Sequence, residues 1–167
     1  IGDPLLNTSI LEWNAKHVPL TEAWWNYPAF APLTGVTAWT EHLLGAYPLT
    51  TPIIWLTENP VLAYSVLLMV CFVANGLAMF ALVRHLTASN AAAWVAGFAY
   101  AFAPYQASAV AHVQVLMAFG MPLALWGLHQ YVEDQRRAGI AWFAAGWAAV
   151  VLSNAYFLVL FPVLLAL

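Results

Sequence analysis

The stretch Val61–Val83 reads VLAYSVLLMVCFVANGLAMFALV and contains no charged side chain. A helix needs about 20 apolar residues to cross the hydrocarbon core of a bilayer, so this stretch is long enough to span one. Two further runs, 86–132 and 138–167, also lack Asp, Glu, Lys and Arg. They are too long, and alternate too little, for the strands of a membrane barrel, so we predict membrane-spanning helices.

The composition agrees with a lipid environment. Hydrophobic residues make up 64% of the chain and charged residues only 7%, with a mean hydropathy of +0.79. A soluble domain carries charges on about a quarter of its residues, so a water-facing shell cannot be built here. We therefore predict an all-α fold, a polytopic transmembrane helical bundle in contact with the lipid bilayer. The net charge of −3 gives no reason to expect nucleic acid as a partner.

The charged residues predict a topology. Basic residues in short loops mark the cytoplasmic side, and Arg84, Arg136 and Arg137 lie between the apolar runs. We expect residues 1–60 to form a large extracytoplasmic loop, and residues 61–167 to form about four or five spans in the bacterial inner membrane. The expected spans, which run alternately inward and outward, are 61–83, 91–103, 113–132 and 140–152, followed by a last apolar segment. Because the chain begins without Met and stops inside an apolar run, we expect it to be part of a longer protein.

The first 60 residues predict an ordered, membrane-associated loop. Asp3-Pro4 is a typical helix start, with Asp3 as the N-cap. Glu12 and Lys16 are spaced to form an i,i+4 pair on the helix that follows. Tryptophan and tyrosine are dense between Pro19 and Pro32, which suits the headgroup layer. The segment 43–57 is too short and too rich in proline for a span, so we expect an interfacial or re-entrant helix.

Several short motifs together resemble a known family. They are Gly2-Asp3-Pro4, Glu41-His42-Leu43-Leu44-Gly45, Asn59-Pro60-Val61-Leu62-Ala63-Tyr64, and Ala103-Pro104-Tyr105 with His112-Val113-Gln114. In this order they resemble the N-terminal portion of bacterial GT-C-type membrane glycosyltransferases, in particular the uncharacterised multi-spanning members of that superfamily. The resemblance implies a polyprenyl-phosphate-linked sugar as donor and transfer at the extracytoplasmic face.

The resemblance also implies a catalytic residue. The family's acid or base is an Asp or Glu in the first outer loop, and Asp3 occupies that position. A hydroxyl acceptor loses a proton as it attacks the anomeric carbon, and a carboxylate within hydrogen-bond reach can accept it. The alternative for Asp3 is a helix cap with no catalytic role.

Four further residues are candidates for substrate binding. Glu41 or His42 could join Asp3 in contacting a phosphate or a divalent ion, and the resemblance leaves open whether a metal takes part. The alternative is a polar pair at the approach to the membrane. His112 and Gln114 follow the Pro104 turn, where polar groups near the membrane are costly unless partnered. They could contact the donor phosphate or a sugar hydroxyl, or they could simply be solvated in a turn.

Other features have structural interpretations. His85 and His129 fall at predicted cytoplasmic ends, where anchoring is more typical than pigment ligation. Asn75-Gly76 and the alanine-rich stretch 91–103 predict close helix packing through small residues. The sequence contains no Gly-rich phosphate loop, HExxH helix or GxSxG elbow. Two other functions stay open: a non-catalytic membrane subunit that braces a larger complex with other subunits, and a transporter.

Overall fold

The computed structural model describes residues 2–165, and every regular element in that range is helical. In chain order the elements are α1 (Asp3–Lys16), α2 (Glu22–Trp25), η1 (Pro28–Phe30), η2 (Val36–Ala38), η3 (Leu44–Ala46), α3 (Tyr47–Thr57), α4 (Pro60–Thr87), α5 (Asn90–Ala101), α6 (Pro104–Ser108), η4 (Ala109–Ala111), α7 (Val113–Leu116), α8 (Gly120–Val132), α9 (Ala138–Val151) and α10 (Ala155–Leu165). The prediction of an all-α chain is confirmed for these residues.

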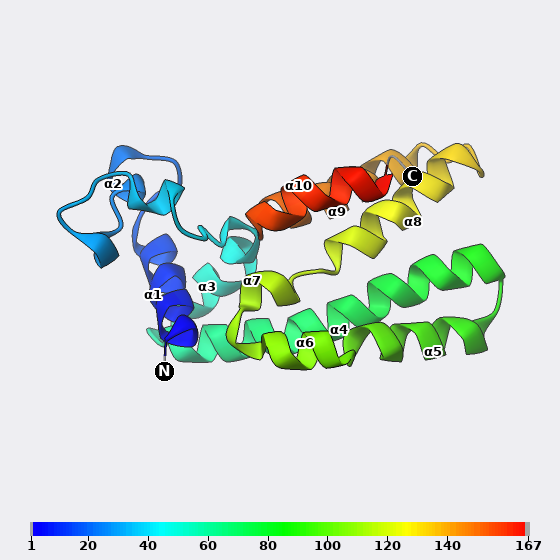
Figure 1. Ribbon diagram of the computed structural model, residues 1–167, viewed down its shortest axis with the longest axis horizontal. Coiled ribbons are helices and arrows are strands. Elements are labelled where there is room, and N and C mark those ends of the chain that lie inside the picture. Colours follow the sequence, from blue (N-terminus) through cyan, green and yellow to red (C-terminus); the bar gives the residue numbers. More distant parts are fainter. Residues whose placement is uncertain (1, 166–167) are drawn as a thin grey trace.

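The molecule is elongated, with two helical hairpins that point the same way (Figure 1). α4 and α5 form one hairpin, α8 and α9 form the other, and both turns lie at the end opposite α1. α1, α2 and α3 lie together at the end of the molecule away from the hairpin turns, where α1 and α3 pack on the first half of α4. The hairpins therefore place residues 88–89 and 133–137 at one end of the molecule.

Local sequence explains where α4 and α5 begin and end. The side chain of Asn59 accepts a hydrogen bond from the Leu62 N–H, and Pro60 starts the helix. α4 ends at Ala88 in the left-handed conformation, and Ser89 then caps α5 by accepting from the Ala92 N–H. A two-residue turn between capped helices makes antiparallel neighbours of them.

Glycines set how closely the helices approach. A Cβ added to Gly97 in α5 would lie 2.8 Å from the Gly76 carbonyl oxygen in α4, so the predicted small-residue packing is present. The α8–α9 hairpin has an even closer helix contact at glycines, which was not predicted from the sequence. Added Cβ atoms on its four glycines would collide with the backbone of the facing helix; these glycines are Gly120, Gly127, Gly139 and Gly146. Their seven-residue spacing within each helix was the available signal.

The segment between the hairpins is irregular, and side chains from other helices satisfy its backbone. Four hydrogen bonds reach its carbonyl oxygens from α1, α4 and α5: Asn7 to Ala111, Tyr64 to Val110, Asn75 to Leu116 and Tyr100 to Ala118. Irregular backbone is tolerated inside a membrane only when protein groups satisfy it in this way. This segment carries His112.

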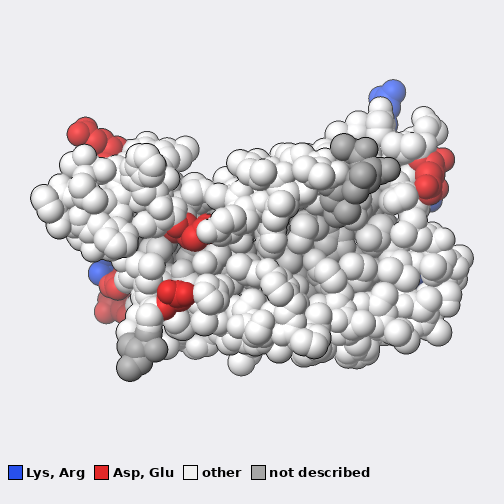
Figure 2. All heavy atoms as spheres, in the orientation of Figure 1, with Lys and Arg blue, Asp and Glu red and all other residues white. Residues whose placement is uncertain are grey.

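Two stretches are long and apolar enough to cross a membrane, judged by length and composition: Pro60–Thr87 and Val113–Val132. The first, at 28 residues, is about 42 Å long. The second is interrupted at residues 117–119, between α7 and α8. Figure 2 shows that charged side chains on the face drawn lie over the α1–α3 end and at the opposite tip, with an uncharged surface between them.

Candidate functional site

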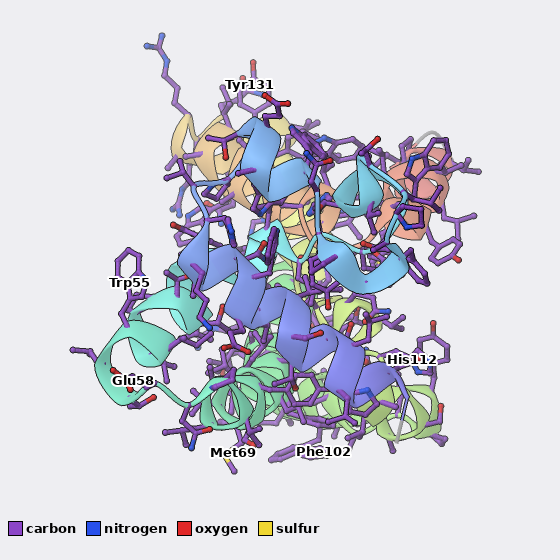
Figure 3. All side chains as sticks on the ribbon, turned by 90° about the vertical axis from the view of Figure 1, so that its left-hand side faces the viewer. Trp55, Glu58, Met69, Phe102, His112 and Tyr131 are labelled. Atoms are coloured by element: carbon purple, nitrogen blue, oxygen red, sulfur yellow. The ribbon has the colours of Figure 1, made fainter. Side chains whose placement is uncertain are left out.

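Asp3 and His112 meet at the surface, although 109 positions separate them in the sequence. The Asp3 carboxylate oxygen Oδ2 lies 2.7 Å from Nε2 of His112. Both side chains are about half exposed, at 55% and 47%, so a substrate can reach either one. In Figure 3 His112 lies beside the first turn of α1. The pair combines a proton acceptor with a group that can donate a hydrogen bond to it.

The start of α1 corrects one expectation. Asp3 was predicted as the N-cap, but the helix already includes Asp3, and Gly2 is the residue before it. No side chain caps this end; the Gly2 carbonyl accepts from the N–H groups of Leu5 and Leu6 instead. The Asp3 carboxylate is engaged with His112 and is not folded back on its own helix. The capping explanation for Asp3 is therefore wrong.

His112 occupies a break between two short helices. It ends η4 and precedes α7, with φ −120° and ψ 72°, outside the helical region. Its N–H donates to the Ala109 carbonyl at 2.8 Å, and its own carbonyl accepts from the Val115 N–H at 2.8 Å. Val113 and Leu116, fully buried on the following turn, anchor the segment in the core.

Asn7 links α1 to this segment one turn after Asp3. Its side chain is buried, and Nδ2 lies 3.3 Å from both the Ala111 carbonyl oxygen and Oε1 of Gln114. Gln114, one of the predicted binding residues, therefore lies in the same neighbourhood as Asp3 and His112, through Asn7. Sequence analysis missed Asn7, although its position four residues after Asp3 places both on one helical face.

Tyr64 is a second residue that the sequence analysis missed. It lies on α4, is 7% exposed, and its hydroxyl donates to the Val110 carbonyl at 3.1 Å. Tyr64 was noted only as part of the Asn-Pro-Val-Leu-Ala-Tyr motif. Its contact with a residue 46 positions later had no signal in the sequence.

Glu41 and His42 lie elsewhere. The His42 carbonyl accepts from Asn14 Nδ2 at 2.9 Å, and Asn14 is eleven residues, or about 16 Å, further along α1 than Asp3. His42 Nδ1 accepts from the Leu44 N–H at 3.1 Å, and its ring lies near Trp24. The structure does not bring this pair together with Asp3.

Burial perturbs both of these groups. Desolvation raises the pKa of the Glu41 carboxyl above 4.5, and a hydrogen bond from the Ala155 backbone N–H, at the start of α10, acts in the opposite direction. Desolvation lowers the pKa of His42 below 6.5. The contacts of Glu41 and His42 join this pair to α10 and α1, which favours a structural role for them.

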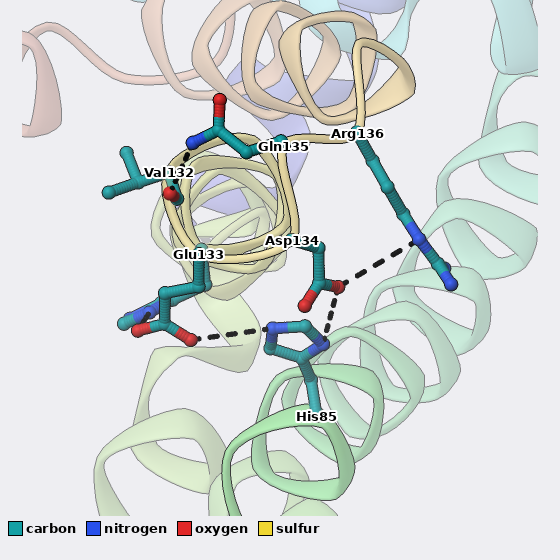
Figure 4. A network of polar contacts seen from close by, with 7 residues as sticks. His85, Val132, Glu133, Asp134, Gln135 and Arg136 are labelled. Atoms are coloured by element: carbon teal, nitrogen blue, oxygen red, sulfur yellow. Dashed lines mark hydrogen bonds and ion pairs between the residues drawn. The ribbon is translucent and has the colours of Figure 1, made fainter.

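A second group of titratable side chains lies at the opposite end of the molecule (Figure 4). His85, on α4, lies between two carboxylates of the α8–α9 turn, 3.8 Å from Glu133 and 3.9 Å from Asp134. His129 contacts Glu133 at 2.8 Å, and Arg136 lies 3.9 Å from Asp134. The two His85 contacts connect the hairpins at this end of the molecule, and the other two lie within the second hairpin.

An apolar groove of about 260 Å³ lies on the outer face of α4 and α5. Aromatic rings line it in a row, with Phe80, Trp94 and Phe98 in successive contact and Phe72 stacked on Phe102. Figure 3 shows Phe102 and Met69 on the outside of the bundle. Phe72 lies eight residues, or about 12 Å, along α4 from Tyr64, so one end of the groove approaches the His112 segment.

The described residues 2–165 contain no group of three or more His, Cys, Asp or Glu side chains placed to hold a metal ion. Comparisons with protein-family models, with curated proteins and with solved structures give no match for this chain.

Proposed function

We propose that this chain belongs to a membrane glycosyltransferase that transfers a sugar from a polyprenyl-phosphate donor to a hydroxyl acceptor at the extracytoplasmic face. The observation that supports it is the contact of 2.7 Å between Asp3 and His112, both accessible at the surface. The proposed site consists of Asp3, His112 and Gln114. Glu41 and His42 are not included because His42 contacts Asn14, which lies about 16 Å along α1 from Asp3.

Asp3 is the proposed general base. The acceptor oxygen forms a bond to the anomeric carbon while the bond from that carbon to the phosphate oxygen breaks, and the phosphate leaves with the electron pair. The hydroxyl proton passes to the Asp3 carboxylate, which must lie within about 3 Å of it. His112, through Nε2, holds the carboxylate by a hydrogen bond and leaves its second oxygen free for the acceptor.

The proposed setting is a polytopic bundle whose long axis crosses the bilayer. Two apolar stretches are long enough for this, and α5 and α9 are shorter helices paired with them in hairpins. The uncharged surface between the charged ends in Figure 2 supports the same orientation. In it, Asp3 and His112 belong to the extracytoplasmic end and Arg84 to the cytoplasmic end, as the positive-inside rule requires.

The groove on α4 and α5 is the proposed binding site for the lipid chain of the donor. Its lining is apolar, and its Phe72–Phe102 end lies nearest the Asp3 site. A polyprenyl phosphate with a diazirine near its head should crosslink to peptides that contain Phe72 or Phe102. Crosslinking confined to α8–α10 would contradict this assignment.

The experiment for the activity is transfer by the full-length protein in bilayer vesicles that contain radiolabelled polyprenyl-phosphate sugar. Asp3→Asn keeps the shape and hydrogen-bonding capacity of the side chain but cannot accept the proton, so we expect a loss of at least about 100-fold in kcat. Glu12→Gln, on the same helix and paired only with Lys16 in the structure, is the matched control. Equal activity of the two variants would overturn the role of Asp3.

A non-catalytic subunit is the second candidate, and one observation favours it. Trp39, which follows η2, and Leu56, on α3, are 87% and 85% exposed in the region of the α1–α3 end. Apolar side chains exposed in that region suit contact with another membrane subunit. Unchanged transfer activity in Asp3→Asn, together with co-purification of a stable partner, would favour this candidate.

A further inference from the structure

Asp3 and Asn7 form a two-point contact between α1 and the segment that carries His112. They lie one turn apart on α1; Asp3 contacts His112 itself, and Asn7 contacts Ala111, just before it, and Gln114, two positions after it. The exposed Asp3–His112 contact is open to water, whereas Asn7 is only 3% exposed. The buried contact is therefore the one protected from competition with solvent.

We propose that Asn7 is a positioning residue that fixes the register of Asp3 against His112. The effect of Asn7 on catalysis rests on the proposed function. Its effect on the contact between Asp3 and His112 can be tested without measuring any activity. The Asn7 side-chain nitrogen Nδ2 donates to two acceptors. One is the carbonyl oxygen of Ala111, before His112, and the other is the side-chain oxygen of Gln114, after it. Without this link nothing on α1 except Asp3 itself engages the polar groups of residues 111–114 in the described structure.

The backbone around His112 needs such a link. Its dihedral angles lie outside the helical region, and the helices on either side, η4 and α7, have three and four residues. Helices of that length do not hold a conformation by themselves. Tyr64 and Asn75 hold the segment from α4, and Ile10 and Leu11 of α1 share a core with Val113 and Leu116. Asn7 adds the directional contact from α1, a hydrogen bond to the backbone next to His112.

The first measurement is ¹⁵N NMR of histidine-labelled full-length protein in bilayer discs, with the His112 signal assigned through His112→Gln. At a pH where imidazole is neutral, Asp3 accepting from Nε2–H should hold His112 in the Nε2–H tautomer. Asn7→Leu keeps the number and branching of the side-chain heavy atoms and removes both hydrogen bonds. We expect this variant to lose the single-tautomer signature, as should Asp3→Leu, which removes the acceptor itself.

The matched control is Asn14→Leu, seven residues further along the same face of α1. Asn14 is fully buried and also makes two side-chain hydrogen bonds, to Trp24 and His42. Its loss should lower stability in a similar way but leave the His112 signature intact. If Asn7→Leu does not fold, Asn7→Ser, whose shorter side chain cannot reach both acceptors, replaces it. An unchanged His112 signature in the folded Asn7 variant overturns the inference.

Transfer kinetics separate this inference from the proposed function. A misplacement of about 1 Å can cost up to about 100-fold in rate, so Asn7→Leu should lower kcat by up to that factor while the KM for the donor changes less. A wild-type protein with no transferase activity but with an Asn7-dependent His112 signature would overturn the function and leave the positioning role. An active protein in which Asn7→Leu and Asn14→Leu have equal kcat would overturn the positioning role alone.

Discussion

The imidazole of His42 is packed against Trp24, and burial lowers its pKa below 6.5. Between its folded pKa and 6.5, the unfolded chain binds a proton that the folded chain does not. The contribution of His42 to stability is therefore complete above pH 6.5 and is lost as the pH falls below that value. The contacts of residues 42–44 with α1 and with Trp24 should therefore weaken on mild acidification.

The variant that tests this is His42→Asn. The asparagine side chain can still accept from the Leu44 N–H, as in an Asx-turn, but it does not titrate. We expect the difference in Tm between wild type and variant to shift in favour of the variant as the pH falls from 7 to about 5, by a few degrees at most for a partly exposed group. Thermal unfolding in detergent at stepped pH measures it. A pH-independent difference would contradict the prediction.

Glu41 provides a control in which the pH dependence of stability has the opposite sign. Its pKa is raised, so the folded chain holds a proton that the unfolded chain has released, and its contribution to stability falls as the pH rises above 4.5. Glu41→Gln keeps an oxygen that can accept from the Ala155 N–H but carries no charge. The two variants should therefore change the pH profile of Tm in opposite directions.

At the scale of elements, the contact between α8 and α9 depends on the absence of side chains. A Cβ added to Gly127 would lie within 3.0 Å of backbone atoms of Gly139, Trp142 and Phe143. Backbone cannot move aside as a side chain can, so the helices must separate. Gly127→Ala should destabilise the protein by about 1–3 kcal/mol, the usual cost of overpacking.

Gly76→Ala is the matched control on the other hairpin. Its added Cβ meets the Ala101 Cβ and the Gly97 carbonyl at 3.5 Å, which is ordinary contact. Alanine also favours a helix over glycine by about 1 kcal/mol, so this variant should be neutral or stabilising. Denaturation of both variants by sodium dodecyl sulfate, followed by circular dichroism, compares them. Equal losses would show that the α8–α9 contact is not specially close.

At the scale of the whole molecule, the proposed orientation can be tested with cysteine labelling. The native Cys71 is fully buried, so it gives little background. Thr34 is exposed between η1 and η2, at the α1–α3 end. Arg137 is exposed at the turn between α8 and α9. An impermeant maleimide should label Thr34→Cys in intact bacterial cells, and Arg137→Cys only after the membrane is opened. Labelling of both positions in intact cells would contradict the topology.

The pattern of charge and hydropathy indicated more of the fold than of the site. Helical structure, the turn near residue 88 and the Glu12–Lys16 pair followed from local rules and are present. The break at residues 117–119 was not predicted, although Pro122 was a local signal for it: proline has no N–H to donate to the Ala118 carbonyl four residues earlier. The tertiary partner that replaces this bond, the Tyr100 hydroxyl, had no signal in the sequence. The Asp3 cap was predicted wrongly because local sequence suggested a partner within the helix.

What the sequence determined by itself is the helical class of the molecule, because long apolar runs with little alternation favour helices over strands. What only the tertiary structure decided is the set of side chains that meet. Asp3 and His112 were separate candidates in the sequence, and the packing of α1 against the irregular segment after α5 brings them to 2.7 Å. The same packing places Glu41 and His42 at the other end of α1. Such contacts depend on which helices pack together, and one sequence carries no direct record of that.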